Sequence, residues 1–134
     1  MFGVSYDRLK VGVNVLAAWW WKTELKPDDF AGESLKNKGT LAVLFVASWC
    51  SFCRRFYPVF QAAAKRSGIP WASLDISDVD NPLWETFSIE VVPTVIIFKE
   101  GEAVFRKDGV FGRGLSEKAI EETMDRMKLL STTS

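Results

Sequence analysis

The feature that most constrains the fold is a buried-strand signal that runs directly into a pair of cysteines. Residues 41–48, LAVLFVAS, form a run of apolar and small residues with β-branched and aromatic members. Such a run fits a strand that is buried on both faces, as in a parallel sheet. Cys50 and Cys53, the only two cysteines of the chain, come immediately after it. The chain therefore has to bury this strand within a sheet and leave two thiols at its end.

The elements around this strand predict an α/β fold with helices on both faces of the sheet. Residues 50–68 predict an amphipathic helix, because apolar side chains recur there at three- and four-residue spacing. Pro58 lies inside that pattern and is expected to kink the helix. The order then predicts a strand at 69–77, a short helix that starts at Asn81 and Pro82, a hairpin turning at Glu100–Gly101, and a last helix capped by Ser116.

Two further segments complete this reading of the chain. Pro27, Asp28 and Asp29 have the chemistry of a helix start, and they predict a short helix over 28–39 that ends at Gly39. The whole order predicts a mixed central sheet, in which a parallel βαβ unit is extended by an antiparallel pair.

We separate an N-terminal extension, residues 1–23, from a domain formed by residues 24–134. An apolar stretch at 11–21 ends in three adjacent tryptophans. It is too short to span a membrane, which takes roughly 20 apolar residues. Our preferred interpretation is an extra strand or helix packed on the domain. A membrane-interface anchor built on the tryptophans and a targeting peptide are the alternatives.

Composition excludes several kinds of function. Basic and acidic side chains number 17 each, so charge gives no reason to expect nucleic acid as a partner. Histidine is absent, which rules out Ser–His and Cys–His nucleophile pairs and imidazole metal ligands. With two cysteines and no histidine, a zinc site would need carboxylates or a second subunit, and we expect no metal and no cofactor.

The cysteine pair is better explained by redox chemistry than by structure. A strand that leads into a helix places Cys50 at the helix N-terminus, where unpaired amides and the helix dipole favour a thiolate. Cys53 lies one turn later and is expected to be less exposed. It can attack a mixed disulfide on Cys50 and release the substrate, so that two thiols complete a cycle that one cannot. The alternative is that the two cysteines are small buried hydrophobic residues with no chemical role.

Together, these motifs resemble the thioredoxin family over roughly residues 24–130. The match rests on WCSFCR, on Pro58 five residues after the second cysteine, on VVPTVIIFKEGE, and on the later Gly109. The resemblance implies a thioredoxin fold with an extra N-terminal arm. It also implies a redox-active disulfide between Cys50 and Cys53, with Cys50 as the attacking thiol and Cys53 as the resolving thiol.

The resemblance also assigns substrate-binding and supporting residues. It implies that Trp49 flanks the site as an apolar lid and that Pro93 is a cis-proline. The backbone of Val92 is then expected to pair with an extended substrate segment, and Gly109 to let the substrate backbone approach. Phe52, Arg54 and Pro58 are the supporting residues: Phe52 adds apolar surface, Arg54 is either a family-type basic residue or a solvated charge, and Pro58 bends the helix.

The sequence departs from the family pattern at three places. Ser51 and Phe52 replace the usual Gly-Pro between the cysteines, which leaves the redox potential open. Leu44 stands where the family has a buried acid, and Ser73 where it has a lysine, so proton transfer to Cys53 is expected to be slower or to use water. Four extra residues at 111–114 have no counterpart in a minimal thioredoxin.

We therefore expect a monomeric, cytoplasmic thiol–disulfide oxidoreductase that reduces protein disulfides and receives electrons from a thioredoxin-reductase-type donor. One alternative is an extracytoplasmic disulfide oxidase or isomerase, tethered by the N-terminal segment; membrane contact through this arm is not favoured. A second alternative, from another class, is a binding or chaperone module that uses the groove without redox turnover.

Overall fold

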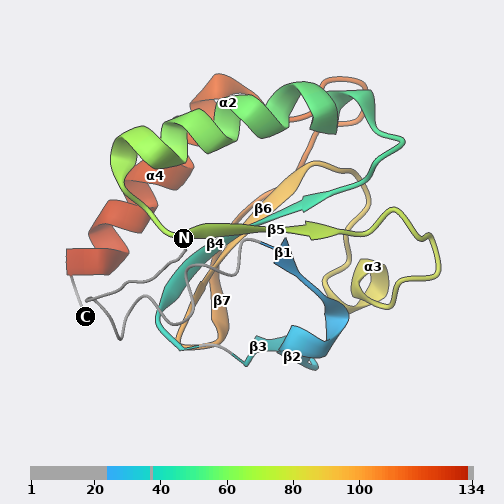
Figure 1. The fold of residues 1–134 in the computed structure, drawn as a ribbon, viewed down its shortest axis with the longest axis horizontal. Helices are drawn as coiled ribbons and strands as arrows, with labels where there is room; N and C mark the ends of the chain where they lie inside the picture. The colour runs from blue at the N-terminus through green and yellow to red at the C-terminus, as the bar shows by residue number, and fades with distance from the viewer. Residues whose placement is uncertain (1–23, 37, 133–134) are drawn as a thin grey trace, which may run out of the picture.

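The computed structural model describes residues 24–36 and 38–132, which form a sheet with covering elements on both faces (Figure 1). The N-terminal extension, residues 1–23, lies outside the described residues, so its interpretation stays a prediction. Along the chain the elements are β1 (Glu24–Leu25), the 3-10 turn η1 (Pro27–Asp29), β2 (Phe30–Ala31), β3 (Ser34–Leu35), β4 (Thr40–Val46), α2 (Ser51–Ser67), β5 (Trp71–Asp75), α3 (Leu83–Thr86), β6 (Thr94–Lys99), β7 (Glu102–Lys107) and α4 (Glu117–Thr132). No helix within these residues is long and apolar enough to cross a membrane.

The main sheet is mixed, as the sequence predicts. Its strand order is β1-β5-β4-β6-β7. β5 is parallel to both β1 and β4, whereas β6 runs antiparallel to β4 and β7 antiparallel to β6. The parallel β4–β5 pair needs a crossover connection, and α2 provides it. The β6–β7 hairpin turns at Glu100 and Gly101, whose φ angles of 50° and 89° are those of a tight hairpin turn.

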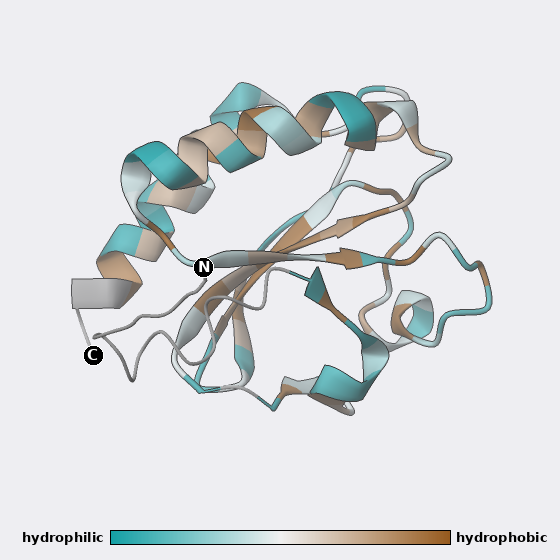
Figure 2. Cartoon of the chain, in the orientation of Figure 1, coloured by the Kyte–Doolittle hydropathy of each residue, from teal (hydrophilic) through white to brown (hydrophobic). Residues whose placement is uncertain are grey.

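Strand β4 lies in the middle of this sheet and is buried on both faces. Ala42 and Leu44 face one core, and Val43 and Phe45 face the other. Helices α2 and α4 cover the first face, while α3 and the β2–β3 hairpin lie on the second (Figure 1). Figure 2 shows the apolar residues along the strands and the hydrophilic residues on the outer helix surfaces. The strand end that carries the cysteines is thereby held between two packed layers.

The ends of the helices follow the capping residues seen in the sequence. Cys50 is the N-cap of α2, and Gly68 ends this helix in the left-handed conformation with φ 66°. Helix α2 continues through Pro58 to Ser67. The Ser116 hydroxyl accepts a hydrogen bond from the Ala119 amide at 3.1 Å and so caps α4.

The short helix α3 begins one residue later than predicted, at Leu83 instead of Pro82. The side chain expected to start it still does so, because Asn81 Oδ1 accepts a hydrogen bond from the Leu83 amide at 2.9 Å. The boundary moves, but the capping interaction that motivated it is present.

The helix predicted over 28–39 is wrong. Only one 3-10 turn forms at Pro27–Asp29, and Asp29 closes it by accepting a hydrogen bond from the Lys26 amide at 2.8 Å. A small antiparallel hairpin, β2–β3, follows, in which Phe30 and Leu35 are paired and both buried. Residues five apart lie about 140° apart around a helix, so a helix could not bury both side chains on one face. Pairing across a hairpin does.

Candidate active site

Cys50 lies at the junction between β4 and α2 and is the N-cap residue of the helix. Its Sγ accepts a hydrogen bond from the Cys53 amide at 3.2 Å. Its thiol donates to the carbonyl oxygen of Val92 at 3.4 Å. An amide donor of the first helical turn therefore points at this sulfur, which is the arrangement that stabilises negative charge on it.

Cys53 lies one helical turn further on and is the more buried of the two thiols. The exposed fraction is 3% for Cys53 and 8% for Cys50, and neither is in a disulfide in this structure. Burial raises the pKa of Cys53 from 9.0 to about 12, and the hydrogen bond to Cys50 adds to this increase. At neutral pH Cys53 is thus held as a protonated thiol.

Trp49 precedes Cys50 and lies over the loop that follows β5. Its side chain is 55% exposed, and its Nε1 donates to the Ser77 carbonyl at 2.9 Å. The ring stacks on Trp84 of α3, with the ring centroids 6.2 Å apart. The expected role of Trp49 as an apolar lid over the cysteines stays a prediction.

Hydrogen bonds of Ser77 and Asp75 hold this loop against the residues before Cys50. The Ser77 hydroxyl accepts a hydrogen bond from the Ser48 amide at 2.6 Å and donates to Asp75. Asp75 also accepts from the Ser77 amide at 2.8 Å. This connection joins the end of β5 to the residues just before the cysteine motif. Sequence reasoning missed it, and missed the contact with Trp84.

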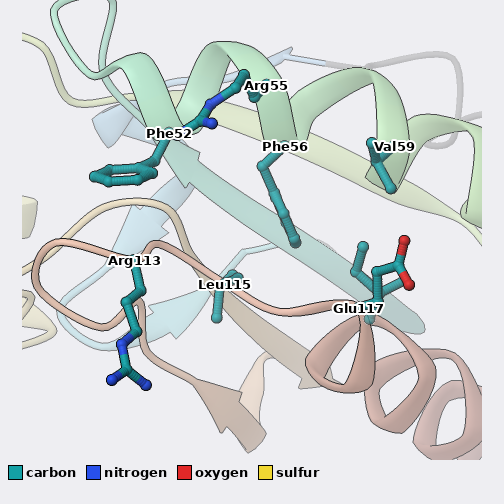
Figure 3. Close-up of a pocket in the computed structure, with 8 residues that line it drawn as sticks. Phe52, Arg55, Phe56, Val59, Arg113, Leu115 and Glu117 are labelled. Atoms are coloured by element: carbon teal, nitrogen blue, oxygen red, sulfur yellow. The ribbon is translucent and has the colours of Figure 1, made fainter.

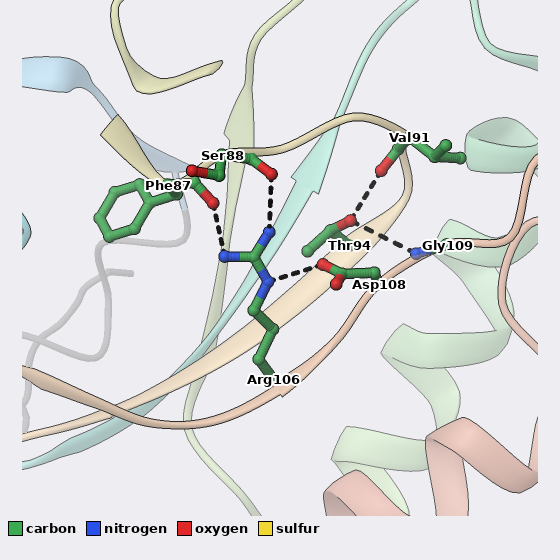
Figure 4. Close-up of polar contacts among 7 residues, drawn as sticks. All are labelled: Phe87, Ser88, Val91, Thr94, Arg106, Asp108 and Gly109. Carbon is green, nitrogen blue, oxygen red and sulfur yellow. Dashed lines mark hydrogen bonds and ion pairs between the residues drawn. The ribbon is translucent and has the colours of Figure 1, made fainter. Parts of the chain in front are cut away.

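The loop before β6 lies against Cys50 from the other side. The Val92–Pro93 peptide bond is cis, in agreement with the resemblance. Thr94, which is fully buried, donates to the Val91 carbonyl at 2.7 Å and accepts from the Gly109 amide at 3.4 Å (Figure 4). Thr94 was missed by the sequence analysis, although it directly follows Pro93.

Gly109 lies against this loop so closely that no side chain fits there. A Cβ atom added to it would stand 2.5 Å from the Pro93 carbonyl oxygen and 3.2 Å from a Val91 methyl group. The glycine is therefore required by internal packing. Its expected role in admitting substrate backbone stays a prediction.

Arg106 of β7 forms hydrogen bonds with the segment that precedes the cis-proline loop. Its guanidinium donates to the carbonyl oxygens of Phe87 and Ser88, and it pairs with Asp108 at 2.6 Å (Figure 4). The contacts join residues that are 18 and 19 positions apart in the chain. No local sequence signal points to them.

The supporting residues are placed around the first turn of α2. Phe52 is half-buried, and the guanidinium of Arg55 lies 5.1 Å from the centre of its ring. Arg54 donates to the Ser48 carbonyl at 2.9 Å, so it is not simply a solvated charge. The positive charge of Arg54 also lowers the pKa of Cys53, although by less than burial raises it.

The two residues that replace the family's buried acid and lysine are neighbours inside the sheet. Leu44 of β4 pairs with Ser73 of β5, with exposed fractions of 0% and 5%. Within the described residues no carboxylate or amine is buried; the buried polar residues are Ser73, Thr94 and Thr123. Within the same residues, no group of three possible metal-ligating side chains occurs.

Comparison with known proteins agrees with this geometry. Residues 22–126 match the family model described as Thioredoxin. A thioredoxin of Chlamydia muridarum is 37% identical over 71% of this chain and 91% of its own length. Thioredoxin H4 of Arabidopsis thaliana is 31% identical over 77% of this chain and 82% of its own length. Among solved structures, the thioredoxin of Fasciola hepatica aligns with a TM-score of 0.57 and 31% identity, over 69% of this chain and 85% of that chain.

Proposed function

The chain belongs to the thioredoxin family, and from this premise we propose that it reduces disulfide bonds of proteins through Cys50 and Cys53. It is a thiol–disulfide oxidoreductase, as its relatives indicate. The observation that carries the assignment of the two sulfurs is their asymmetry. Cys50 accepts a helix-end amide hydrogen bond, whereas Cys53 is more buried and has a pKa of about 12.

In the first step the Cys50 thiolate attacks one sulfur of the substrate disulfide. A bond forms between Cys50 and that sulfur, and the second substrate sulfur leaves as a thiolate. The Cys53 amide that donates to Cys50 Sγ at 3.2 Å stabilises the attacking charge. During this step the Cys53 thiol keeps its proton, because its pKa lies near 12.

In the second step Cys53 attacks the Cys50 sulfur and the remaining substrate sulfur leaves. The protein ends with a Cys50–Cys53 disulfide, and two electrons have passed to the substrate. Cys53 must lose its proton for this attack. Once Cys50 is in a mixed disulfide, its charge and its thiol no longer raise the pKa of Cys53; burial, the main cause, remains. With Leu44 and Ser73 at the usual charged positions, we propose that water accepts the proton.

The remaining parts of the cycle are proposals that follow from family membership. A thioredoxin-reductase-type partner returns the two electrons, and the protein acts as a cytoplasmic monomer. An extended substrate segment lies along Val92 and Pro93, since the Val92 carbonyl is within 3.4 Å of Cys50 Sγ. Size-exclusion chromatography and cell fractionation check the monomer and the compartment.

Reduction of insulin in the presence of dithiothreitol tests the proposed function. Wild-type protein should accelerate the turbidity that follows insulin reduction, and Cys50→Ser should not. When the reduced Cys53→Ser variant is mixed with insulin without dithiothreitol, mixed disulfides should accumulate, because no second thiol of the chain resolves them. Wild-type rates equal to those of Cys50→Ser would refute the assignment.

The direction of transfer is tested by the redox potential of the Cys50–Cys53 pair in glutathione buffers. A value of about −270 mV supports a reductase, and one of about −120 to −180 mV supports an oxidase or isomerase. The thioredoxin relatives do not favour the oxidase or the binding module. A binding module would still retain its clients when both cysteines are replaced by serine.

A further inference from the structure

A cavity of about 240 Å³ lies beside the cysteine motif, between the first turns of α2 and the segment that leads into α4 (Figure 3). Phe52, Val59 and Leu115 contribute apolar walls, and Arg55 and Glu117 contribute charge. The volume is below the roughly 300–1,000 Å³ of sites for small ligands, and it suits one side chain of a polypeptide.

The four residues 111–114, which distinguish this chain from a minimal thioredoxin, border the cavity, and Arg113 is the one of them that lines it. Val110 and Gly114 close this insertion into an ordered turn, with amide-to-carbonyl distances of 2.8 Å in both directions. Gly114, with φ 76°, approaches Phe52 so closely that an added Cβ would stand 3.0 Å from the Phe52 Cβ. The insertion therefore lies directly against Phe52, one of the two residues between the cysteines.

The charges of the cavity are separated along its length. Arg55 lies over the Phe52 ring at the end nearer Cys50, and Glu117 lies at the far end, while the Arg113 side chain points away from α2 (Figure 3). Within the described residues Arg55 pairs with no carboxylate. A substrate that enters from the cysteines therefore meets Phe52 and the Arg55 cation first, and the apolar side chains of Val59 and Leu115 after them.

We propose that this cavity is a second substrate subsite, which binds an apolar side chain of the substrate. An acidic residue of the substrate, between that side chain and the substrate cysteine, pairs with Arg55. The proposal rests on the proposed function and names the class of polypeptide it acts on. At 1.5 Å per residue, Arg55 lies about 8 Å and Val59 about 13 Å along the helix axis from Cys50. An extended chain advances about 3.3 Å per residue, so the acidic residue stands two to three positions, and the apolar residue four, from the substrate cysteine.

Peptides that carry one cysteine as a mixed disulfide with thionitrobenzoate test the subsite. The reduced protein becomes oxidised at Cys50 and Cys53, and each peptide disulfide yields one peptide thiol and one coloured thionitrobenzoate. In two series, running toward either end of the peptide from cysteine, Glu at the third position and Leu at the fourth are compared with Lys and Ser. The second-order rate constant for oxidation of the reduced wild type should be about 10-fold higher for the Glu-Leu peptide in one series.

Three variants connect any preference to the cavity. Arg55→Glu reverses the charge at this position, and Val59→Glu places a charge on the apolar wall. Because Val59 is 45% exposed, its substitution leaves the core intact. Val104→Glu is the matched control, because Val104 is 41% exposed on β7 and does not line the cavity. The first two variants should abolish the peptide preference, and the control should retain it. All three should reduce bis(2-hydroxyethyl) disulfide, which is small and uncharged, at the wild-type rate.

The outcomes separate the two proposals. Equal rates for all peptides with the wild type, or a preference that survives both Arg55→Glu and Val59→Glu, overturn the subsite. Reduction of bis(2-hydroxyethyl) disulfide then leaves the proposed function standing. Failure of the wild type to reduce bis(2-hydroxyethyl) disulfide and insulin faster than Cys50→Ser overturns the proposed function, and the subsite with it.

Discussion

The protonation of Cys53 is the property of this site that alkylation can test most directly. The change is Cys50→Ser, which leaves Cys53 as the only thiol of the chain. Burial, the largest cause of the raised pKa, is unaffected by this substitution, and the serine hydroxyl occupies the place of the neighbouring thiol. The pKa of Cys53 should therefore stay well above 9.0.

The expected magnitude follows from the shift in pKa. A rise from 9.0 to about 12 is three pKa units, so the thiolate fraction of Cys53 below pH 9 falls about 1,000-fold. Restricted access to a side chain that is 3% exposed lowers the rate further. Access changes the size of the rate constant, however, whereas the pKa determines the pH at which the rate stops rising.

Iodoacetamide labelling between pH 7 and 10.5, followed by mass spectrometry, measures this pH dependence. The rate constant of Cys50→Ser should rise about tenfold per pH unit over the whole range without a plateau. The same variant unfolded in urea serves as the control and should reach its plateau near the ordinary pKa of a cysteine. A plateau near pH 9 in the folded variant would show that Cys53 is not held protonated, and our account of the resolving step would be wrong.

Three further predictions follow from the same contacts. Because the unfolded chain ionises Cys53 above pH 9.0 and the folded chain only near 12, the contribution of Cys53 to the stability of the reduced protein is constant below pH 9 and falls, by up to about 4 kcal/mol, as the pH rises toward 12. Urea unfolding should show this loss relative to Cys53→Ala, which lacks it. Gly109→Ala has to move the Pro93 carbonyl, which stands 2.5 Å from the new Cβ, and we expect a loss of about 1–3 kcal/mol in urea unfolding together with slower insulin reduction; full activity and stability would contradict this contact. Arg106→Met leaves the Phe87 and Ser88 carbonyls without their charged donor and should lower the free energy of unfolding by about 1–3 kcal/mol. Arg126→Met, which removes only a ring contact with Phe105, should lower it by less than about 1 kcal/mol, and equal losses would show that the hydrogen bonds of Arg106 are unimportant.

The elements that depend on local signals were predictable from the sequence. The strand at 41–48 and the helix that starts at Cys50 each depend on residues close together in the chain, and β4 and α2 form there. The hairpin at Glu100–Gly101 and the cap at Ser116 are of the same kind. The helix expected at 28–39 failed because the start signal at Pro27–Asp29 was real but was used by a single turn, and burial of Phe30 with Leu35 then decided the outcome.

The surroundings of the cysteines could not be predicted in the same way, because they depend on contacts between distant segments. Ser77 reaches Ser48 across 29 positions, and Arg106 reaches Ser88 across 18. The local sequence around a serine in a loop or an arginine on a strand does not indicate which distant residue it contacts. Only the topology, which places the end of β5 beside the end of β4 and β7 at the edge next to β6, brings these groups together.

Gly109 shows why a residue that the sequence identifies correctly can still have more than one role. The resemblance attributes the glycine to the approach of substrate backbone. In the structure the Pro93 carbonyl already occupies the space where a side chain would be, at 2.5 Å from an added Cβ. Both requirements select the same residue, so the sequence cannot separate them. Because the packing requirement acts before any substrate arrives, substitution of Gly109 must change stability as well as activity, and only a variant that loses activity at unchanged stability would point to the substrate alone.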